Sequence, residues 1–513
     1  MKITFPFGLN ENDDAQPDEA YKGSYNFDLE LARKDWKPRK PLDLVDTTTN
    51  AGDVRGIMQL IKRDDTETTL IQSGAVVYSY DGSTFTSVGA CDATSKLRGC
   101  YWSLDDYLII TDLNKATEIQ KWDGSAFSTQ GTGLVNPFAK YAVVWNNRVW
   151  YFNLTENGTD LSHMILASAF EDPTDCTTSL RSGDSSFITG LESFYLLSPN
   201  LKPINGVAVF KQVLIFSTVD GELFRISGDD SSNYSVVSFY SGSAAIGDES
   251  MANIGNDVIY MRKGGVVESL ISTDTYGDVG ADDLSRWIPE TVKDLPGAIT
   301  VYDQTRQRAL MFTTNKCLVM FKDIMPSGRS PWSIYKTSLS NSFNASSAMW
   351  LRKPGTSTYG VYWGDSSGNI YDMDGTGSGG DGGTDAIFST RKTYYIGPET
   401  IGVDFRKGHL IGRVKYVRMK QVECVLSFEW GDDLNNPTCT IVLKGAQAGD
   451  TGNYYGGANY YGGTDYYNEG FTFANRVSSR GFSPPGRGPG FYFSAEINSD
   501  LDFQILEIEI PSI

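Results

Sequence analysis

A short hairpin pattern that occurs twice early in the chain constrains its fold more than any other feature. Tyr78-Ser-Tyr-Asp-Gly-Ser-Thr-Phe85 is followed, about 40 residues later, by Gln120-Lys-Trp-Asp-Gly-Ser-Ala-Phe127. Each copy is typical of a strand with alternating apolar residues, a two-residue Asp-Gly turn and a return strand that begins with Phe. A repeat of this length, carried by short strands and turns, indicates β-propeller blades.

Length and composition agree with an all-β protein. The chain has 513 residues, so more than one domain is expected, and its 53 Gly, 28 Tyr and 26 Phe are typical of strands and turns. Paired apolar strands recur up to residue 373, which predicts a β-propeller of about seven blades, in the range of about six to eight. Alternating apolar residues in Phe491–Ile497 and Phe503–Ile510 predict a β-sandwich-like domain after the propeller.

Shifts in composition suggest the domain boundaries. We expect an extended N-terminal arm over residues 1–50, the propeller over 51–373, a Gly-rich linker over 374–385 and a C-terminal β domain over 386–513. A loop rich in Tyr and Gly interrupts the last domain at 453–470.

The overall charge argues against broad binding of nucleic acid. The formal net charge is −19, whereas a protein that grips DNA over a wide surface neutralises phosphates with Lys and Arg. The six Cys show no C-x-x-C spacing, so we interpret them as reduced thiols. The N-terminus lacks the apolar run of a secretory signal, and no stretch has the ~20 apolar residues of a membrane span, which predicts synthesis in the cytoplasm.

No residue pattern points to catalysis, to a metal or to a cofactor. The two His, His163 and His409, have no recognisable Ser, Cys or metal-ligand partners, and phosphate-binding and dinucleotide-binding motifs are missing from the sequence. The segments Asp365–Asn369 and Asp112–Glu118 resemble parts of calcium loops, but Asx turns explain both. We therefore expect no catalytic, metal or cofactor-binding residues.

A basic segment stands out near the N-terminus. It contains Arg33, Lys34, Trp36, Lys37, Arg39 and Lys40. In an acidic chain such a segment is a candidate arm for docking onto an acidic partner, and a solvated extended strand is the alternative.

Tandem Tyr pairs mark a second candidate contact region. They are Tyr454, Tyr455, Tyr460, Tyr461, Tyr466 and Tyr467, each pair followed by small or polar residues. Tyr on a loop offers a large contact area with a polar hydroxyl, which is typical of binding surfaces, although a packed structural loop fits equally well.

The order of these parts resembles a known family. The arm with Tyr25–Leu29 and Trp36–Leu42, the strand pattern Trp145–Asn153 and the closing strands Phe491–Ile497 and Phe503–Ile510 are similar to the tail nozzle proteins of short-tailed bacteriophages. That group includes packaged-DNA stabilisation proteins and tail tubular protein B.

The resemblance implies a structural protein of the virion tail, made in the cytoplasm of the host bacterium. A homohexamer would close and conduct the DNA channel below the portal and adaptor rings, so that it retains packaged DNA and guides its ejection. The implied partners are other copies of the chain, the adaptor or head-to-tail connector, tail fibres or spikes, and viral double-stranded DNA that passes without sequence-specific binding.

Two other classes of protein remain open at this point. A receptor-binding or glycan-binding propeller would act as a tail adhesin, with the Tyr-rich loop as its contact. A polysaccharide-degrading propeller would use a pair of carboxylates around the sugar bond. Because no residue pattern favours chemistry and a fold does not imply function, the non-enzymatic nozzle is the first expectation.

Overall fold

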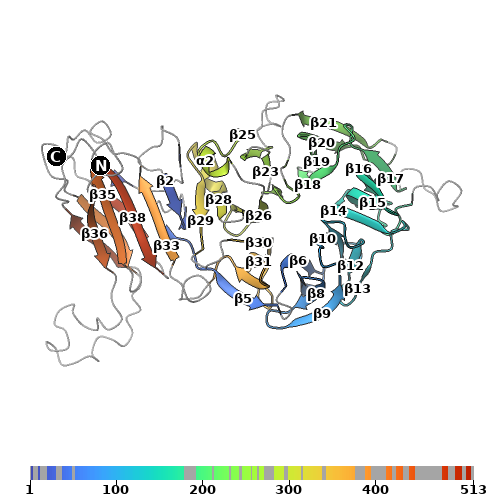
Figure 1. The fold of residues 1–513 in the computed structure, drawn as a ribbon, viewed down its shortest axis with the longest axis horizontal. Helices are drawn as coiled ribbons and strands as arrows, with labels where there is room; N and C mark the ends of the chain where they lie inside the picture. The colour runs from blue at the N-terminus through green and yellow to red at the C-terminus, as the bar shows by residue number, and fades with distance from the viewer. Residues whose placement is uncertain are drawn as a thin grey trace. The chain divides into compact units, whose positions relative to one another are not determined.

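The computed structural model shows an all-β protein that contains a seven-bladed β-propeller (Figure 1). Side chains are described for the propeller strands and for parts of the N-terminal segment, and only the backbone is described for the strands from 387 onward. The described residues are 2–3, 10–11, 20–29, 37–48, 52–177, 192–210, 213–229, 231, 233–241, 245, 247–255, 257–262, 265–270, 282–293, 298–313, 316–337, 343–375, 387–393, 412–418, 423–430, 438–444, 476–482, 491–499 and 504–509.

The first five blades are four-stranded antiparallel meanders that follow one another along the chain. Their strands are β6 (Val54–Ile61), β7 (Glu67–Ser73), β8 (Val76–Tyr80) and β9 (Phe85–Ala90); β10 (Leu97–Trp102), β11 (Tyr107–Asp112), β12 (Gln120–Trp122) and β13 (Phe127–Thr129); β14 (Pro137–Trp145), β15 (Arg148–Glu156), β16 (Thr159–Ala167) and β17 (Phe194–Leu197); β18 (Ile204–Phe210), β19 (Val213–Thr218), β20 (Glu222–Ser227) and β21 (Ser235–Ser241); β22 (Met251–Asn253), β23 (Val258–Arg262), β24 (Val266–Ser269) and β25 (Asp282–Asp283).

The sixth blade is again built from consecutive strands, whereas the seventh takes its outer strand from the N-terminal segment. The sixth contains β26 (Ile299–Asp303), β27 (Arg308–Phe312), β28 (Cys317–Phe321) and β29 (Trp332–Tyr335), and the seventh contains β30 (Ala345–Arg352), β31 (Tyr359–Asp365), β32 (Asn369–Asp372) and β5 (Asp43–Thr47). β5 is the outer strand of the seventh blade, where Thr48 N donates to Gly368 O at 2.9 Å. An N-terminal strand therefore closes the ring.

Apolar side chains between neighbouring blades hold the propeller together. One cluster joins the third and fourth blades and centres on Trp150, Phe152 and Phe216, whose side chains are buried. A second cluster joins the first blade to the second. A third joins the seventh blade to the first and includes Ile57 and Ile71. Burying each such side chain is worth roughly 1.5–3 kcal/mol, so the interfaces between blades supply much of the stability.

The repeated hairpin is confirmed, but its turn is longer than expected. Tyr80 pairs with Phe85 and Trp122 pairs with Phe127, so each loop holds the residues 81–84 or 123–126 rather than a two-residue turn. The reason lies in Asp81, whose carboxylate accepts bonds from the backbone N–H of Ser83 at 2.9 Å and Thr84 at 2.8 Å. Asp123 caps the second loop in the same way.

The chain forms two compact units that are not consecutive in sequence. Unit 1 holds residues 1–43, 315–343 and 373–513, and unit 2 holds 44–314 and 344–372. This differs from the predicted consecutive division, since residues 44–50 belong to unit 2 and the segment with β28 and β29 belongs to unit 1. Most of the predicted linker, residues 376–385, lies outside the described residues.

Unit 1 contains two larger sheets. In the first, β29 pairs in parallel with β2 (Ala20–Tyr25), and the sheet continues through β33, β38, β35 and β36. In the second, the strand order is β1-β39-β34-β37. Its further strands are β1 (Lys2–Ile3), β3 (Phe27–Asp28), β4 (Lys37–Pro38), β33 (Ile387–Thr393), β34 (Gly412–Arg418), β35 (Glu423–Trp430), β36 (Thr438–Lys444), β37 (Arg476–Phe482), β38 (Phe491–Ser499) and β39 (Gln504–Glu509).

Helical structure is sparse among the described residues. It comprises the single turn α2 (Pro289–Val292) and the 3-10 helix η2 (Lys322–Ser327). Neither helix has the length and apolar character that a membrane crossing requires. In the described part of the chain, Cys91, Cys100, Cys176 and Cys317 are free thiols, and burial raises the pKa of Cys91 to about 11.

Candidate functional site

The basic segment near the N-terminus divides between buried and exposed residues. Arg33, Lys34 and Trp36 lie outside the described residues, and only the backbone of Lys37, in β4, is described. Lys40 is exposed, whereas Arg39 is buried at 3% exposure. Arg39 therefore does not belong to a solvated extended strand, which was the alternative to a docking arm.

Arg39 is held by contacts within unit 1. Its Nε donates to Asn26 Oδ1 at 3.0 Å, and its remaining guanidinium nitrogens donate to Lys40 O at 2.8 Å and Lys336 O at 3.0 Å. The guanidinium also lies 5.8 Å from the ring centroid of Tyr335. Arg39 thus joins the N-terminal segment to the strand β29, and docking stays a prediction for the rest of the basic segment.

The Tyr-rich loop is the other predicted contact region. All of Tyr454, Tyr455, Tyr460, Tyr461, Tyr466 and Tyr467 lie outside the described residues. Its role therefore stays a prediction.

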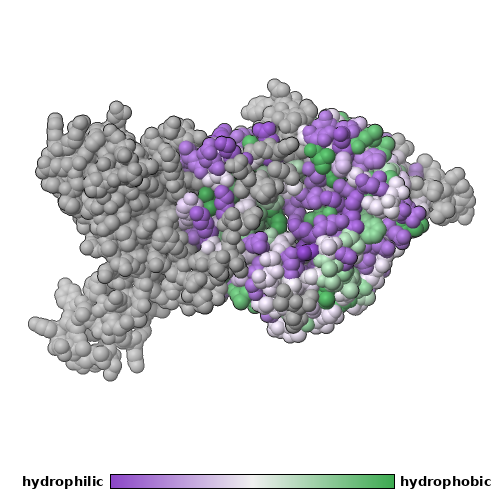
Figure 2. Space-filling view, in the orientation of Figure 1, coloured by the Kyte–Doolittle hydropathy of each residue, from purple (hydrophilic) through white to green (hydrophobic). Residues whose placement is uncertain are grey.

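A cluster of charged residues at the centre of the propeller was not predicted. The first strands of successive blades contact one another around the ring, so they are its innermost strands. Hydrophilic residues gather beside the centre, over β10, β14 and β18 (Figure 2). Here the segment 247–250, which leads into β22, meets side chains from the second and third blades.

Glu249 is the most heavily paired carboxylate in this cluster. It forms ion pairs with both Lys96 and Arg98 of the second blade, and only 14% of its side chain is exposed. Arg98 also donates to the backbone oxygen of Arg55 in the first blade at 2.7 Å. Glu249 therefore links the segment before the fifth blade directly to the second blade and, through Arg98, to the first.

Asp248 forms the second half of the cluster. Its carboxylate accepts a bond from Lys140 Nζ at 2.9 Å and another from the Tyr141 hydroxyl at 2.8 Å, both from β14 of the third blade. Adjacent carboxylates thus point to different blades, which fixes the direction of the segment that carries them.

Backbone contacts tie the same segment to the fourth and sixth blades. Asn205 Nδ2 of β18 donates to Ala245 O at 2.6 Å. On the other side, Thr300 N of β26 donates to Glu249 O at 2.9 Å, and the Thr300 hydroxyl donates to Ser250 O at 3.3 Å. Residue 245 and residues 247–250 therefore contact four blades besides their own, and we call them together the central pin.

Charge and burial shift two pKa values in the cluster. Burial alone would raise the pKa of Glu249, but Arg98 and Lys96 outweigh it and leave that pKa below its ordinary value of 4.5. Burial raises the pKa of Tyr141, and the neighbouring Asp248 adds to the increase. The carboxylate of Glu249 is therefore charged and the phenol of Tyr141 is neutral at neutral pH.

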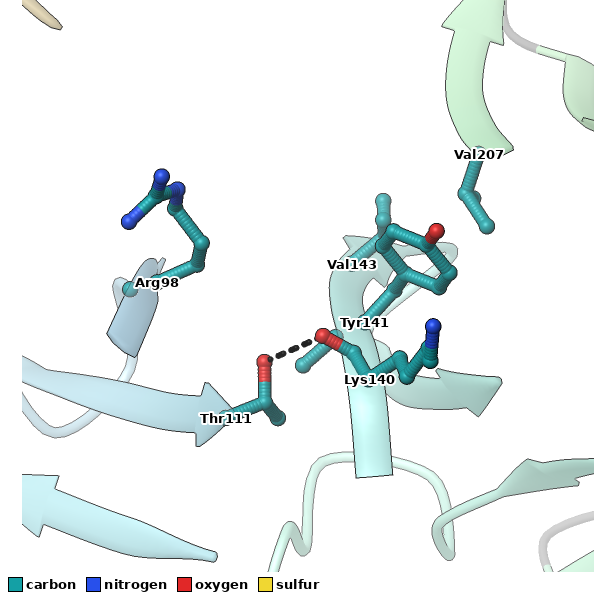
Figure 3. Close-up of a pocket in the computed structure, with 8 residues that line it drawn as sticks. Arg98, Thr111, Lys140, Tyr141, Val143 and Val207 are labelled. Atoms are coloured by element: carbon teal, nitrogen blue, oxygen red, sulfur yellow. Dashed lines mark hydrogen bonds between the residues drawn. The ribbon is translucent and has the colours of Figure 1, made fainter. Parts of the chain in front are cut away.

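A small pocket lies beside the central pin. It has a volume of about 130 Å³ and is lined by residues of β10, β11, β14 and β18 (Figure 3). Arg98, Lys140 and Tyr141 border it, and the Thr111 hydroxyl donates to Lys140 O at 3.1 Å. The pocket can hold several water molecules. The two cationic side chains that line it, Arg98 and Lys140, bind Glu249 and Asp248 and so join the blades.

The residues that the sequence offered for metal binding or catalysis make contacts within the fold. Within the described residues, no three His, Cys, Asp or Glu side chains form a group that could hold a metal ion. His163 lies in β16, where its backbone oxygen accepts a bond from Ser198 N at 3.0 Å. Asp112, part of a predicted calcium-like fragment, instead accepts backbone N–H bonds from Lys96, Asn114 and Thr117.

No protein-family model and no curated protein matches the chain. Among solved structures, it is similar to the extracellular domain of a hybrid two-component system from B. thetaiotaomicron, with 12% identity, a TM-score of 0.41, and coverage of 78% of this chain and 47% of that one.

Two further structures show comparable similarity. PorZ of the type-IX secretion system of Porphyromonas gingivalis has 9% identity and a TM-score of 0.35, and the match covers 68% of this chain and 42% of that one. The Cps50 (Swd1) β-propeller domain of Myceliophteria thermophila has 10% identity and a TM-score of 0.35, with coverage of 66% and 100%. The chain spans less than half of the first two proteins.

Proposed function

We propose that this chain is a structural protein of a bacteriophage tail, the subunit of a homohexameric nozzle in a short-tailed phage. The ring closes and conducts the DNA channel below the portal and adaptor rings. It retains packaged DNA and then guides its ejection. Support comes from the resemblance in the order of parts, in which an N-terminal segment, a propeller and a C-terminal β region follow one another.

The interleaved course of the chain is the observation that carries this proposal. Unit 1 is assembled from three separate stretches, and the N-terminal strands β2 and β5 each join sheets built from much later residues. Unfolding these sheets therefore requires breaking hydrogen bonds between segments that lie far apart in the chain. Such a construction suits a component that must withstand the pressure of packaged DNA. We further propose that the two sheets of unit 1 form a β-sandwich-like domain.

The acidic composition supports a conduit for DNA. With a net charge of −19, carboxylates at a channel wall repel phosphate and let DNA slide without tight binding. Salt screens this repulsion beyond roughly 8–10 Å, so it acts on DNA that comes close to the channel wall.

The partners follow from this position in the tail. Exposed Lys40 and the other basic residues predicted for docking, apart from buried Arg39, dock onto the adaptor, and the Tyr-rich loop contacts tail fibres or the host surface. The protein is made in the cytoplasm of the host bacterium and ends in the virion tail.

Retention of DNA tests the proposal directly. Phage heads that are filled in the absence of this protein should lose their DNA to nuclease, and addition of the purified chain should restore protection. Heads that keep their DNA equally well without the chain would contradict the nozzle role. Binding to host glycan or cleavage of host polysaccharide by the purified chain would then favour the adhesin or the enzyme.

A further inference from the structure

Two Asn-Gly pairs occur in the sequence, and the fold places them in opposite surroundings. Asn157 and Gly158 form the two-residue loop between β15 and β16, where Glu156 pairs with Thr159. Asn205 and Gly206 lie inside β18 of the fourth blade. An Asn side chain followed by Gly readily loses ammonia, because Gly has no side chain to shield its backbone nitrogen. The surroundings of each pair therefore decide whether it reacts.

The reacting groups of the first pair are open to solvent. Asn157 and Gly158 are exposed, and their φ values of +46° and +76° are those of a type I′ turn. The backbone N–H of Asn157 donates to Val135 O at 3.0 Å, but among the described residues neither the Asn157 side-chain amide nor the Gly158 N–H has a hydrogen-bond partner. A Cβ added to Gly158 would meet no atom within 4 Å. The loop therefore has room to rotate.

The second pair is held by its neighbours. Asn205 Nδ2 donates to Ala245 O at 2.6 Å, and Asn205 Oδ1 accepts a bond from the Ser217 hydroxyl at 2.8 Å. Gly206 is buried opposite Ser217 in the sheet, and a Cβ added to it would lie 2.7 Å from Ser217 Oγ. Reaction at Asn205 therefore requires these bonds to break in a local opening of the blade.

We propose that Asn157 is a site of spontaneous deamidation in the folded protein. The Gly158 nitrogen gives its proton to solvent and attacks Cγ of Asn157. The new C–N bond closes a succinimide ring, the bond from Cγ to Nδ2 breaks, and Nδ2 leaves as ammonia after it takes up a proton. Water then adds to one of the two ring carbonyls and opens the ring to aspartate or isoaspartate. The reaction consumes only water and does not depend on the nozzle role.

Both products change the end of the hairpin. Each places a new carboxylate between Glu156 and Asp160, and the side chain of Asp160 is 69% exposed and pairs with Lys115 Nζ at 3.1 Å. Isoaspartate also adds one carbon atom to the backbone of a two-residue loop, which cannot then keep the type I′ geometry. We therefore expect the pairing of Glu156 with Thr159 to loosen in the modified chain.

Incubation of the purified protein at mildly alkaline pH tests the proposal. Peptide mapping by mass spectrometry follows both Asn-Gly pairs, and a methyltransferase specific for isoaspartate identifies that product. In the folded protein, Asn157 should be converted at least about tenfold faster than Asn205, because only Asn205 needs a local opening of the blade. In urea, which unfolds the chain, the two pairs should react at similar rates.

Asn157→Gly is the matched variant, because Gly tolerates the positive φ of this loop and carries no amide. It should keep the circular dichroism spectrum of the wild type and release less ammonia, with no isoaspartate at position 157. Equal conversion of Asn157 and Asn205 in the folded protein would overturn the proposal, as would an unmodified Asn157. If the two rates differ as much in urea as in the folded state, the fold is not the cause and the proposal also fails.

Discussion

The Arg98 guanidinium of the second blade binds the Glu249 carboxylate, which precedes the fifth blade, at the centre of the ring. The two residues are 151 positions apart in the chain. Together with the pair of Lys140 and Asp248, this contact makes the central pin a shared support for most of the propeller. Its removal should therefore affect the whole ring.

Glu249→Gln should lower the free energy of unfolding by about 2 kcal/mol. Loss of the charge leaves Lys96 and Arg98 without their shared partner, and the cost stays below the roughly 3–5 kcal/mol of a fully buried pair because both cations are partly exposed. Urea unfolding followed by tryptophan fluorescence measures the change. Glu290→Gln is the control, because the Glu290 side chain is 75% exposed and its ion pair with Lys293 is long, at 3.8 Å. Equal stability of both variants would refute the supporting role of the pin.

The contribution of Glu249 should depend on pH. Its pKa in the folded protein lies below the ordinary value of 4.5, so the unfolded chain takes up the proton first as pH falls. The stabilisation is therefore fully present above about pH 5 and is lost as the pH falls through the folded pKa. The stability difference between the wild type and Glu249→Gln should shrink in acid, when both are measured by urea unfolding at pH 7 and pH 3.5. A constant difference would mean that charge is not the cause.

Arg39→Ala should destabilise unit 1 by about 2–3 kcal/mol. The change removes charge-assisted hydrogen bonds to Asn26, Lys40 and Lys336 that join the N-terminal segment to β29. Lys40→Ala, one position along and exposed, should change stability by less than about 0.5 kcal/mol. Hydrogen exchange of the backbone amides in β29 measures the loss of stability in both variants. Unchanged protection in Arg39→Ala would show that the buried guanidinium does not hold this segment.

Val45→Asp should loosen the closure of the propeller. Val45 of β5 packs against the apolar cluster between the first and seventh blades, where a carboxylate would be poorly solvated. We expect the free energy of unfolding to fall by about 1–2 kcal/mol and proteolytic cleavage near residues 43–50 to become faster. Val45→Ile is the matched control and should be cut at the rate of the wild type. Equal cleavage of all three proteins would show that β5 does not secure the ring.

Local features of the sequence were sufficient to predict the propeller. The Asp-Gly hairpins and the paired apolar strands appear within short windows, so β8, β9, β12 and β13 could be placed from them. The length of the loops was missed because it depends on the capping side chains of Asp81 and Asp123, which satisfy backbone N–H groups beyond the Asp-Gly dipeptide.

Long-range contacts explain what could not be predicted. Arg39 looked like part of a solvated basic segment, but Lys336 O, 297 positions away, accepts a hydrogen bond from its guanidinium. The central pin has no motif of its own, because Asp248 and Glu249 find their partners only when the blades close into a ring. An acidic pair in a Gly- and Ser-rich link between blades was the one available signal.

Electron microscopy of the purified protein tests the nozzle role most directly. Two-dimensional averages should be calculated without imposed symmetry, for the protein alone and after it is mixed with its portal and adaptor complex. We predict a six-fold ring with an axial hole, formed alone or only on the complex. A monomer or trimer that does not bind the complex would contradict the account.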